Sequence, residues 1–299
     1  MAPRIGTSEA GGTFHSQAVA LAELFNRGRP EGGRCAVRPI LLSLDDVRRF
    51  DAGEIEFGFM ASNWIARAGQ GTAPFAGKIA LRVVSPANAG PVFFVTLVRS
   101  PIKTVRDFTG RRIVLGPRGS GMAQHTEVIF KSLGLPLESF TPVYLGFEEG
   151  AEALIKGRVD AQFQRPIPNR VMTDLSQRAD VRVVPYAAGQ LERILAEAPL
   201  YRKVTMKKGA FRGVEEDVDQ LAVINVIAAH ERVKEEVAHE MARTIVENLD
   251  LLPRLNPLFE GIGKLFEPLR LQGPSAFEYG GVPPHPGALR AYREAGWLR

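Results

Sequence analysis

Hydrophobic positions along the chain follow a strand and then a helix period, and this arrangement occurs twice. Near the start, the short strand pattern of Arg4-Ile5 leads into a segment rich in glycine and threonine, residues 6–13. A helix with apolar positions three and four residues apart follows, at Ala18, Leu21, Leu24 and Phe25. In the middle, the apolar segment 112–115 leads into the glycine-rich segment 116–121. A second helix follows, with Val128, Ile129 and Leu133 on one face.

The repetition continues downstream of each glycine-rich segment. A short helix ends at Gly53 in the first half and at Gly157 in the second, and strand patterns follow at 54–59 and 158–163. Glycine at the end of a helix adopts the left-handed conformation that terminates it. Strands that alternate with helices in this way predict a mostly parallel sheet covered by helices.

Two longer apolar strands, 92–98 and 221–227, bracket the second half, and an amphipathic helix beginning near Val233 follows the second of them. We therefore expect an α/β protein with two lobes. Residues 1–98 and 212–299 form lobe 1, and residues 99–211 form an inserted lobe 2. Each lobe is a mixed, mostly parallel sheet flanked by helices, and two strands form the hinge between them.

Composition and charge narrow the class of partner. Hydrophobic residues make up 45% of the chain and charged residues 24%, and no apolar run has the length of a membrane span. The net charge is +5, and residues 99–211 carry 18 Lys and Arg against 11 Asp and Glu. No helix-turn-helix or zinc pattern accompanies these charges, so they favour a small anionic ligand over nucleic acid. We expect a monomer.

Metal, cofactor and catalytic motifs are not predicted. Cys35 is the single cysteine, and the five histidines lack metal-ligand spacing, so we expect neither a metal nor a cofactor. No nucleophile elbow is present. His15 and His125 lie early in the helices that follow the glycine-rich segments, and solvent exposure or packing is their default interpretation. We expect a receptor and not an enzyme, and we predict no catalytic residues.

Both glycine-rich segments precede helices, whose first N–H groups hold anions. Neither has a nucleotide-binding fingerprint. Thr13 and Ser120 are candidate side-chain donors, although each suits a helix N-cap equally well. The neighbouring Ser8 and Met122 complete the candidates from these segments, and we expect Glu9 to face solvent or to receive an amino group.

Cationic and amide side chains follow the predicted strands. Arg118 and Arg165 offer the planar fork that binds a carboxylate in bidentate fashion. Gln162 and Gln164 flank Phe163, so that one face of this strand is polar and is expected to look into the cleft. In lobe 1 the candidates are Asn63 and Trp64, and the indole either stacks on a ligand or packs in the core.

The N-terminal segment lacks the three parts of a secretory leader, which are a charged region, an apolar region and a cleavage site of small residues. Two interpretations remain open, a cytoplasmic protein or a periplasmic protein whose leader has been removed.

Several segments, taken in order, resemble the TAXI-type receptors, the extracytoplasmic solute-binding proteins of TRAP transporters. They begin with Ile5-Gly6-Thr7 and Gly11-Gly12-Thr13-Phe14, and continue through 57–59, 102–112, 116–121, 157–161, 247–249, 285–288 and 292–296. The resemblance implies a receptor with the type II periplasmic binding protein fold. Such a receptor passes a small organic anion, such as a dicarboxylate, an amino acid or an aromatic acid, to TRAP membrane subunits. It implies ligand contacts at Thr13, Phe14, Ser120 and Gly121 and near Gln164 and Arg165.

The chain departs from the family pattern at Glu9, at Phe14-His15 and after Gln164, and these departures favour a ligand other than an amino acid. Two alternatives belong to other classes. One is a cytoplasmic enzyme of the same fold acting on an aromatic acid or a thiamine-precursor-like substrate, with His15, His125 or Glu9 as its acid or base. The other is a cytoplasmic ligand sensor.

Overall fold

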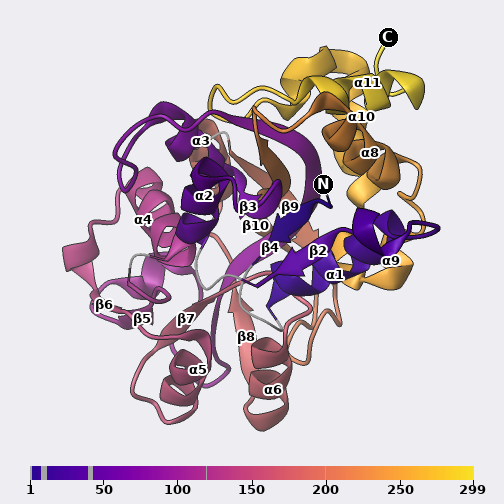
Figure 1. Ribbon diagram of the computed structural model, residues 1–299. Helices are drawn as coiled ribbons and strands as arrows, with labels where there is room; N and C mark the ends of the chain where they lie inside the picture. Colours follow the sequence, from indigo (N-terminus) through magenta and orange to yellow (C-terminus); the bar gives the residue numbers. More distant parts are fainter. Residues whose placement is uncertain (1, 8–11, 40–42, 119, 199) are drawn as a thin grey trace. The chain divides into compact units, whose positions relative to one another are not determined.

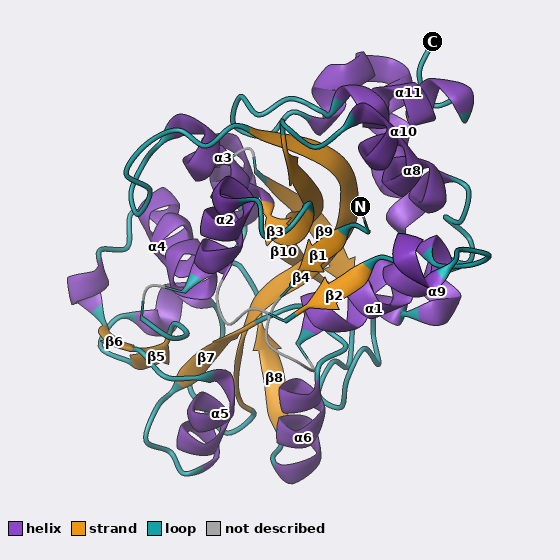
Figure 2. Ribbon diagram, viewed as in Figure 1, coloured by secondary structure: helices purple, strands orange, loops and turns teal. Residues whose placement is uncertain are grey.

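The chain forms two compact units, which are described separately. A computed structural model describes residues 2–7, 12–39, 43–118, 120–198 and 200–299. Unit 1 comprises Met1–Ala89 and Ile224–Arg299, and unit 2 comprises Gly90–Val223 (Figures 1 and 2). Two strands, β4 (Leu81–Leu97) and β10 (Val218–His230), run from one unit into the other. The lobe boundaries expected from the sequence stay a prediction.

Unit 1 is built on a mixed sheet. The strand β1 (Arg4–Gly6) pairs in parallel with β2 (Ala36–Arg38) and β3 (Phe57–Ala61), and β3 pairs antiparallel with β10. Its helices are α1 (Thr13–Phe25), α2 (Ser43–Ala52), α3 (Ser62–Gln70), α8 (Glu235–Val246), α9 (Leu252–Leu255), α10 (Ile262–Gln272) and α11 (Pro286–Glu294). Short 3-10 turns occur at Glu31–Gly33, Pro257–Phe259 and Gly273–Phe277.

Unit 2 has a second mixed sheet. The strand β5 (Arg112–Val114) pairs in parallel with β6 (Thr141–Val143) and β7 (Ala161–Gln164), whereas β7 and β8 (Val181–Val184) both pair antiparallel with β4. The strand β9 (Tyr201–Met206) pairs with β10. The helices are α4 (Gly121–Leu133), α5 (Phe147–Ile155), α6 (Arg170–Arg178) and α7 (Gln190–Glu197), with 3-10 turns at Val105–Phe108 and Leu137–Ser139.

Alternation along β4 divides the core of unit 2 between the two faces of its sheet. Phe94 faces an aromatic cluster, with its ring 4.7 Å from that of Phe163 and 4.9 Å from that of Phe108. Its neighbour Phe93 points to the opposite face and joins the apolar cluster of α5 and α6, which includes Leu154 and Leu175. Successive side chains of a strand point to opposite faces, so neighbouring residues of β4 contribute to the cores on both faces of the sheet.

A chain of buried amides crosses unit 1. The side chain of Asn225 donates to Asn88 Oδ1 at 2.8 Å, and Asn88 Nδ2 donates to Gln17 Oε1 at 2.7 Å. All three residues are less than a tenth exposed. They join β10, β4 and α1, and their mutual bonding removes most of the cost of burying polar groups.

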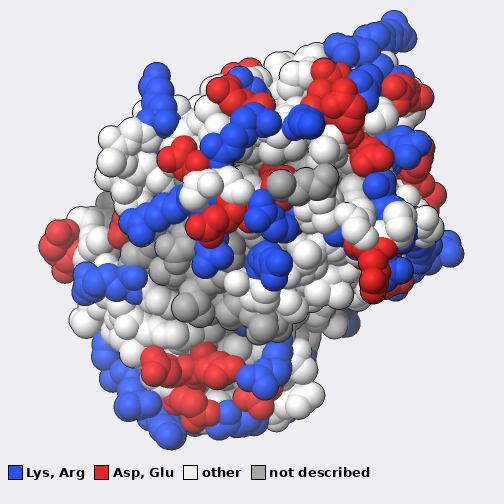
Figure 3. Space-filling model, viewed as in Figure 1, with Lys and Arg blue, Asp and Glu red and all other residues white. Residues whose placement is uncertain are grey.

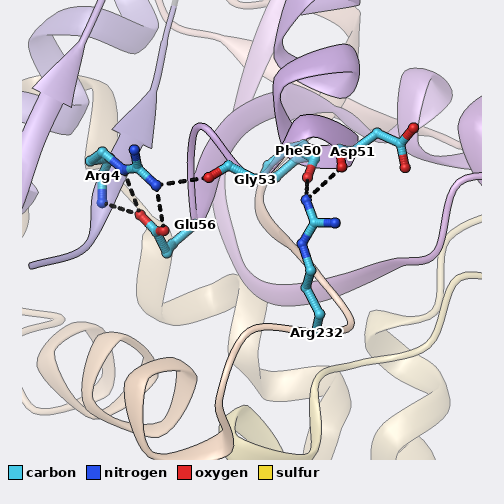
Figure 4. A network of polar contacts seen from close by, with 6 residues as sticks. All are labelled: Arg4, Phe50, Asp51, Gly53, Glu56 and Arg232. Atoms are coloured by element: carbon cyan, nitrogen blue, oxygen red, sulfur yellow. Dashed lines mark hydrogen bonds and ion pairs between the residues drawn. The ribbon is translucent and has the colours of Figure 1, made fainter. Parts of the chain in front are cut away.

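Two arginines hold the end of α2 (Figure 4). Arg4 forms two side-chain hydrogen bonds with Glu56 and donates to the carbonyl of Gly53 at 2.8 Å. Arg232 donates to the carbonyl of Asp51 at 2.7 Å and also to that of Phe50. These guanidinium groups satisfy carbonyls that the end of a helix leaves without intrahelical partners.

Within the described part of the chain, no helix combines the length and the apolar character required for crossing a bilayer.

Candidate functional site

The strands of unit 2 end together at one edge of its sheet. The strands β6, β5 and β7 are parallel, and β8 runs in the same direction as β7 because both oppose β4. We call this the carboxyl edge of unit 2. It is formed by the described residues of 116–122, Tyr144, Gln164, Arg165 and Tyr186. Open α/β sheets bind ligands at such an edge.

The segment after β5 turns back onto the start of α4. Gly116 has φ of +103°, and a Cβ there would lie 3.1 Å from Met122 Cβ and 3.3 Å from Ser120 Oγ. Only glycine combines this backbone conformation with such a close approach. Ser120 is the N-cap of α4, and its Oγ accepts from Ala123 N at 3.2 Å.

The start of α4 shows the capping role given for Ser120 from the sequence, and its contact with a ligand stays a prediction. Ser120 uses an oxygen lone pair for capping and keeps its O–H hydrogen for donation. Gly121 and Met122 are half-buried in the first turn, which contains no acidic residue. The partial positive charge of this helix terminus favours an anion.

Both predicted arginines lie at the carboxyl edge, each over an aromatic ring. The guanidinium carbon of Arg118 is 4.0 Å from the ring centroid of Tyr144, and that of Arg165 is 4.8 Å from that of Phe147. Arg118 is exposed and Arg165 is half-buried. Stacking over a ring orders a guanidinium group without using the donors in its plane.

Two glutamines lie on one face of β7. Gln164 is fully buried, and within the described structure neither its Nε2 nor its Oε1 has a hydrogen-bond partner. Gln162 is also fully buried; its Nε2 donates to the carbonyl of Phe147 at 2.8 Å, and its Oε1 has no partner there. An amide buried without partners costs free energy, so the two atoms of Gln164 are the strongest indication of a ligand contact.

Sequence reasoning missed two residues of this region. The hydroxyl group of Tyr186, just after β8, is buried and has no partner in the described structure, and burial raises its pKa well above the usual range. It therefore stays protonated and can donate. Gln124 Oε1, in α4, is likewise buried without a partner there. Tyr186 follows an alternating apolar strand, the same signal that identified Gln164.

His125 packs inside unit 2. Its Nδ1 lies 2.8 Å from Tyr201 Oη, and the residue is 4% exposed. This is the packed interpretation given from the sequence.

The candidates of unit 1 have mixed outcomes. Gly12 is the N-cap of α1 and Thr13 is the first helical residue, so the capping interpretation of Thr13 is wrong. Its carbonyl accepts from Ser16 Oγ at 2.9 Å. The ring of Phe14 lies 5.9 Å from that of Phe59. Ser8 and Glu9 lie outside the described residues.

The two candidates after β3 differ in environment. Asn63 is half-buried, and its Oδ1 is buried with no partner in the described structure. Trp64 is 3% exposed and makes an edge contact with Phe75 at 5.9 Å. The indole packs in the core, as the second of its two interpretations expected, and its contact with a ligand stays a prediction.

A groove of about 670 Å³ over α5 and α6 is a separate feature. Figure 3 shows the acidic and basic side chains that gather there. Glu148 pairs with Arg170 at 2.6 Å, and Arg178 pairs with both Glu152 and Asp174. Because these charges neutralise one another, the groove is a weaker anion site than the carboxyl edge. Among the described residues, no group of His, Cys, Asp or Glu is arranged to hold a metal ion.

The comparisons with known proteins agree with this architecture. Residues 5–296 match the model of the NMT1-like family. The chain belongs to the NMT1-like family. The matched range covers nearly the full sequence and contains both units and every candidate residue.

Several solved structures similar to this NMT1-like chain are named as solute-binding proteins or import components. The periplasmic aliphatic sulphonate binding protein of Escherichia coli is 17% identical, with a TM-score of 0.51, over 98% of this chain and 83% of that one. A probable amino-acid transporter extracellular-binding protein of Bacillus subtilis is 14% identical, with a TM-score of 0.55, over 87% and 98%. A solved protein structure that concerns glutathione import in Streptococcus mutans is 10% identical, with a TM-score of 0.56, over 88% of this chain and 97% of that one.

These likenesses confirm the expected type II periplasmic binding protein fold. The names of these relatives describe binding and transport.

Proposed function

We propose that this NMT1-like protein is an extracytoplasmic receptor that captures a small organic anion and passes it to a membrane transporter. The observation that carries the proposal is the amide of Gln164, fully buried at the end of β7 with both polar atoms lacking partners in the described structure. A ligand that bonds to this amide would remove the cost of burying it.

The preference for an anion follows from the groups at the same edge. Arg118, Arg165 and the start of α4 all favour negative charge, and the Tyr186 hydroxyl adds a neutral donor. Carboxylates and sulfonates both fit this chemistry, and a carboxylate is our first choice because the guanidinium fork matches its planar geometry. Capture of the ligand between two lobes stays a prediction of the sequence.

The first experiment is thermal unfolding of the purified protein with a panel of carboxylates and sulfonates. A ligand that binds only the folded state stabilises it by about 2.7 kcal/mol at a hundredfold excess over Kd. We expect one ligand to raise Tm, with a smaller shift in Arg118→Met and in Arg165→Met. Arg193→Met, which alters an exposed arginine of α7, is the matched control and is expected to retain the full shift.

Two outcomes would count against the receptor. One is the absence of any shift in protein shown by native mass spectrometry to contain no co-purified ligand. The other is turnover of the bound acid during incubation, which would favour the enzyme alternative.

The type of transporter is a second part of the proposal. The resemblance to TAXI-type receptors supports TRAP membrane subunits, whereas several structural relatives are named as components of ABC-type transporters. Uptake of the identified ligand by reconstituted vesicles would distinguish them. We expect transport with the TRAP subunits and an ion gradient, and uptake only with an ABC permease and ATP would contradict this assignment.

The proposed location is the periplasm, since the receptor role requires access to solute outside the cytoplasmic membrane. Fractionation of cells expressing the natural gene tests it. We expect the protein in the periplasmic fraction, and recovery in the cytoplasm alone would contradict the proposal.

A further inference from the structure

We propose that the captured anion also carries a hydrogen-bond donor, an ammonium or hydroxyl group, and that Gln164 selects for it. The inference rests on the proposed function and specifies the ligand of the same site.

The side-chain amide of Gln164 presents one acceptor and one donor group. Both lack partners in the described structure, and the residue is 0% exposed. The conclusion does not depend on which way the amide is turned, because the oxygen and the nitrogen are both unpaired. A ligand that satisfies this side chain must therefore supply a donor as well as an acceptor.

Neighbouring residues increase the demand for a donor. Gln162 is anchored with Nε2 on the carbonyl of Phe147, which leaves its Oε1 as a second buried acceptor on the same face of β7. Gly150 makes room for this arrangement, since a Cβ there would lie 2.6 Å from Gln162 Nε2. Gln124 Oε1 in α4 is a further buried acceptor of unit 2 without a partner in the described structure.

A simple carboxylate or sulfonate has only acceptor oxygens. Its oxygens can accept hydrogen bonds from donors such as the Tyr186 hydroxyl and the Gln164 Nε2, but they offer nothing to the Gln164 oxygen. A site built to hydrogen-bond a polar group rejects the analogue that lacks it, because its own buried groups are then left unpaired. The anionic group and the donor together describe a hydroxy acid, an amino sulfonate or an amino acid, the last of which is disfavoured by the departures from the family pattern.

Matched ligand pairs test the inference by isothermal titration. The pairs are propionate with lactate and alanine, glutarate with glutamate, and ethanesulfonate with taurine. We expect the donor-bearing member of the preferred pair to bind at least about tenfold more tightly to the unmodified protein, a difference of about 1.4 kcal/mol.

Variants assign the preference to Gln164. Gln164→Met removes both polar atoms at similar volume, and we expect it to reduce the preference to less than about threefold while the donor-free member still binds. Gln164→Glu retains acceptor oxygens and adds a negative charge. We expect it to keep a preference for the ammonium-bearing member and to weaken binding of every anion. Gln177→Met, at an exposed glutamine of α6, is the control and should leave the preference unchanged.

The outcomes are distinguishable. Equal affinities within every pair for the unmodified protein overturn this inference and leave the receptor proposal standing, whether or not the variants fold. A preference that survives in folded Gln164→Met overturns the role of Gln164. The absence of binding by any anion counts against the proposed function itself.

Discussion

The side-chain amide of Asn225 donates to Asn88 Oδ1 at 2.8 Å. Asn88 lies one position from Ala89, where the chain leaves unit 1, and Asn225 lies one position from Ile224, where it returns. This bond ties β10 to β4, and Gln17 extends it to α1. The two crossing strands are therefore held together by polar groups that are almost completely buried.

Replacement of Asn88 by leucine tests this amide chain. The change leaves Gln17 Oε1 and Asn225 Nδ2 without their present partners, and each unsatisfied buried group costs about 1–3 kcal/mol. We expect the free energy of unfolding to fall by about 2–4 kcal/mol in urea titration. Gln272→Leu, at an exposed amide, is the control. Equal midpoints for the two variants would show that the amide chain contributes nothing.

The two arginines at the end of α2 lead to a second prediction. Arg232→Met removes hydrogen bonds to the carbonyls of Phe50 and Asp51, and we expect a loss of about 1 kcal/mol in unfolding free energy. Arg49→Met breaks only the exposed pair with Glu54 at 3.5 Å and should cost less than about 0.5 kcal/mol. A loss of the same size in both variants would argue against this role of Arg232.

Alanine substitutions at glycines in two helices are expected to change the stability of the protein in opposite directions. In Gly150→Ala the new methyl group would lie 2.6 Å from Gln162 Nε2 and 3.0 Å from Val114 Cγ1, so we expect a loss of about 1–3 kcal/mol. In Gly263→Ala, in the first turn of α10, the methyl group meets nothing within 4 Å. Reduced freedom of the unfolded chain should then add about 0.5–1 kcal/mol. Thermal unfolding of both variants checks the signs.

The carboxyl group of Asp160 is expected to make the stability of the folded protein depend on pH. Hydrogen bonds from the Arg112 side chain and backbone hold the pKa of this carboxyl below its usual value of 3.8. The stabilisation is therefore complete above pH 3.8 and is lost as the pH falls through the lowered pKa. We expect Asp160→Asn to be less stable than the unmodified protein by about 1 kcal/mol at neutral pH, a modest figure because Arg112 is partly exposed.

Urea unfolding at a series of pH values measures this effect. The two proteins should approach each other in stability near pH 2, as the carboxyl of the unmodified protein becomes protonated. A constant difference across the whole range would rule out the assigned ion pair as its cause.

The single cysteine gives a chemical test of the core of unit 1. Burial raises the pKa of the Cys35 thiol to about 12, so the reactive thiolate is scarce near neutral pH. We expect negligible reaction with a thiol reagent in the native protein and one equivalent per chain in urea. Rapid labelling of the native state would show that Cys35 is accessible.

Local patterns predicted much of the fold. Ala18, Leu21, Leu24 and Phe25 are all buried in α1, and Gly53 and Gly157 follow α2 and α5 in the left-handed conformation, as expected. These features depend on residues a few positions apart, which periodicity and helix-capping preferences describe well.

Longer-range features were not predictable in the same way. The strand β4 begins at Leu81, well before the expected start at residue 92. The sequence did not reveal this first part because it lacks a continuous apolar pattern. Its polar residues Ser85 and Asn88 are nevertheless buried and hydrogen-bonded. The unpaired hydroxyl of Tyr186 and the amide oxygen of Gln124 depend on tertiary burial, to which a single sequence gives no direct access. Thr13 lies one position inside α1, within the usual uncertainty of helix boundaries.

The passage of β4 and β10 between the units has a consequence for synthesis on the ribosome. Unit 2 is one continuous segment, residues 90–223, and all of it emerges before the remainder of unit 1 is made. Until then β3 lacks its neighbour β10, and the backbone of Phe57–Ala61 is an unpaired edge. Such edges invite pairing with other chains. The part of unit 1 that is made first therefore exposes this edge of β3 until β10 has been synthesised.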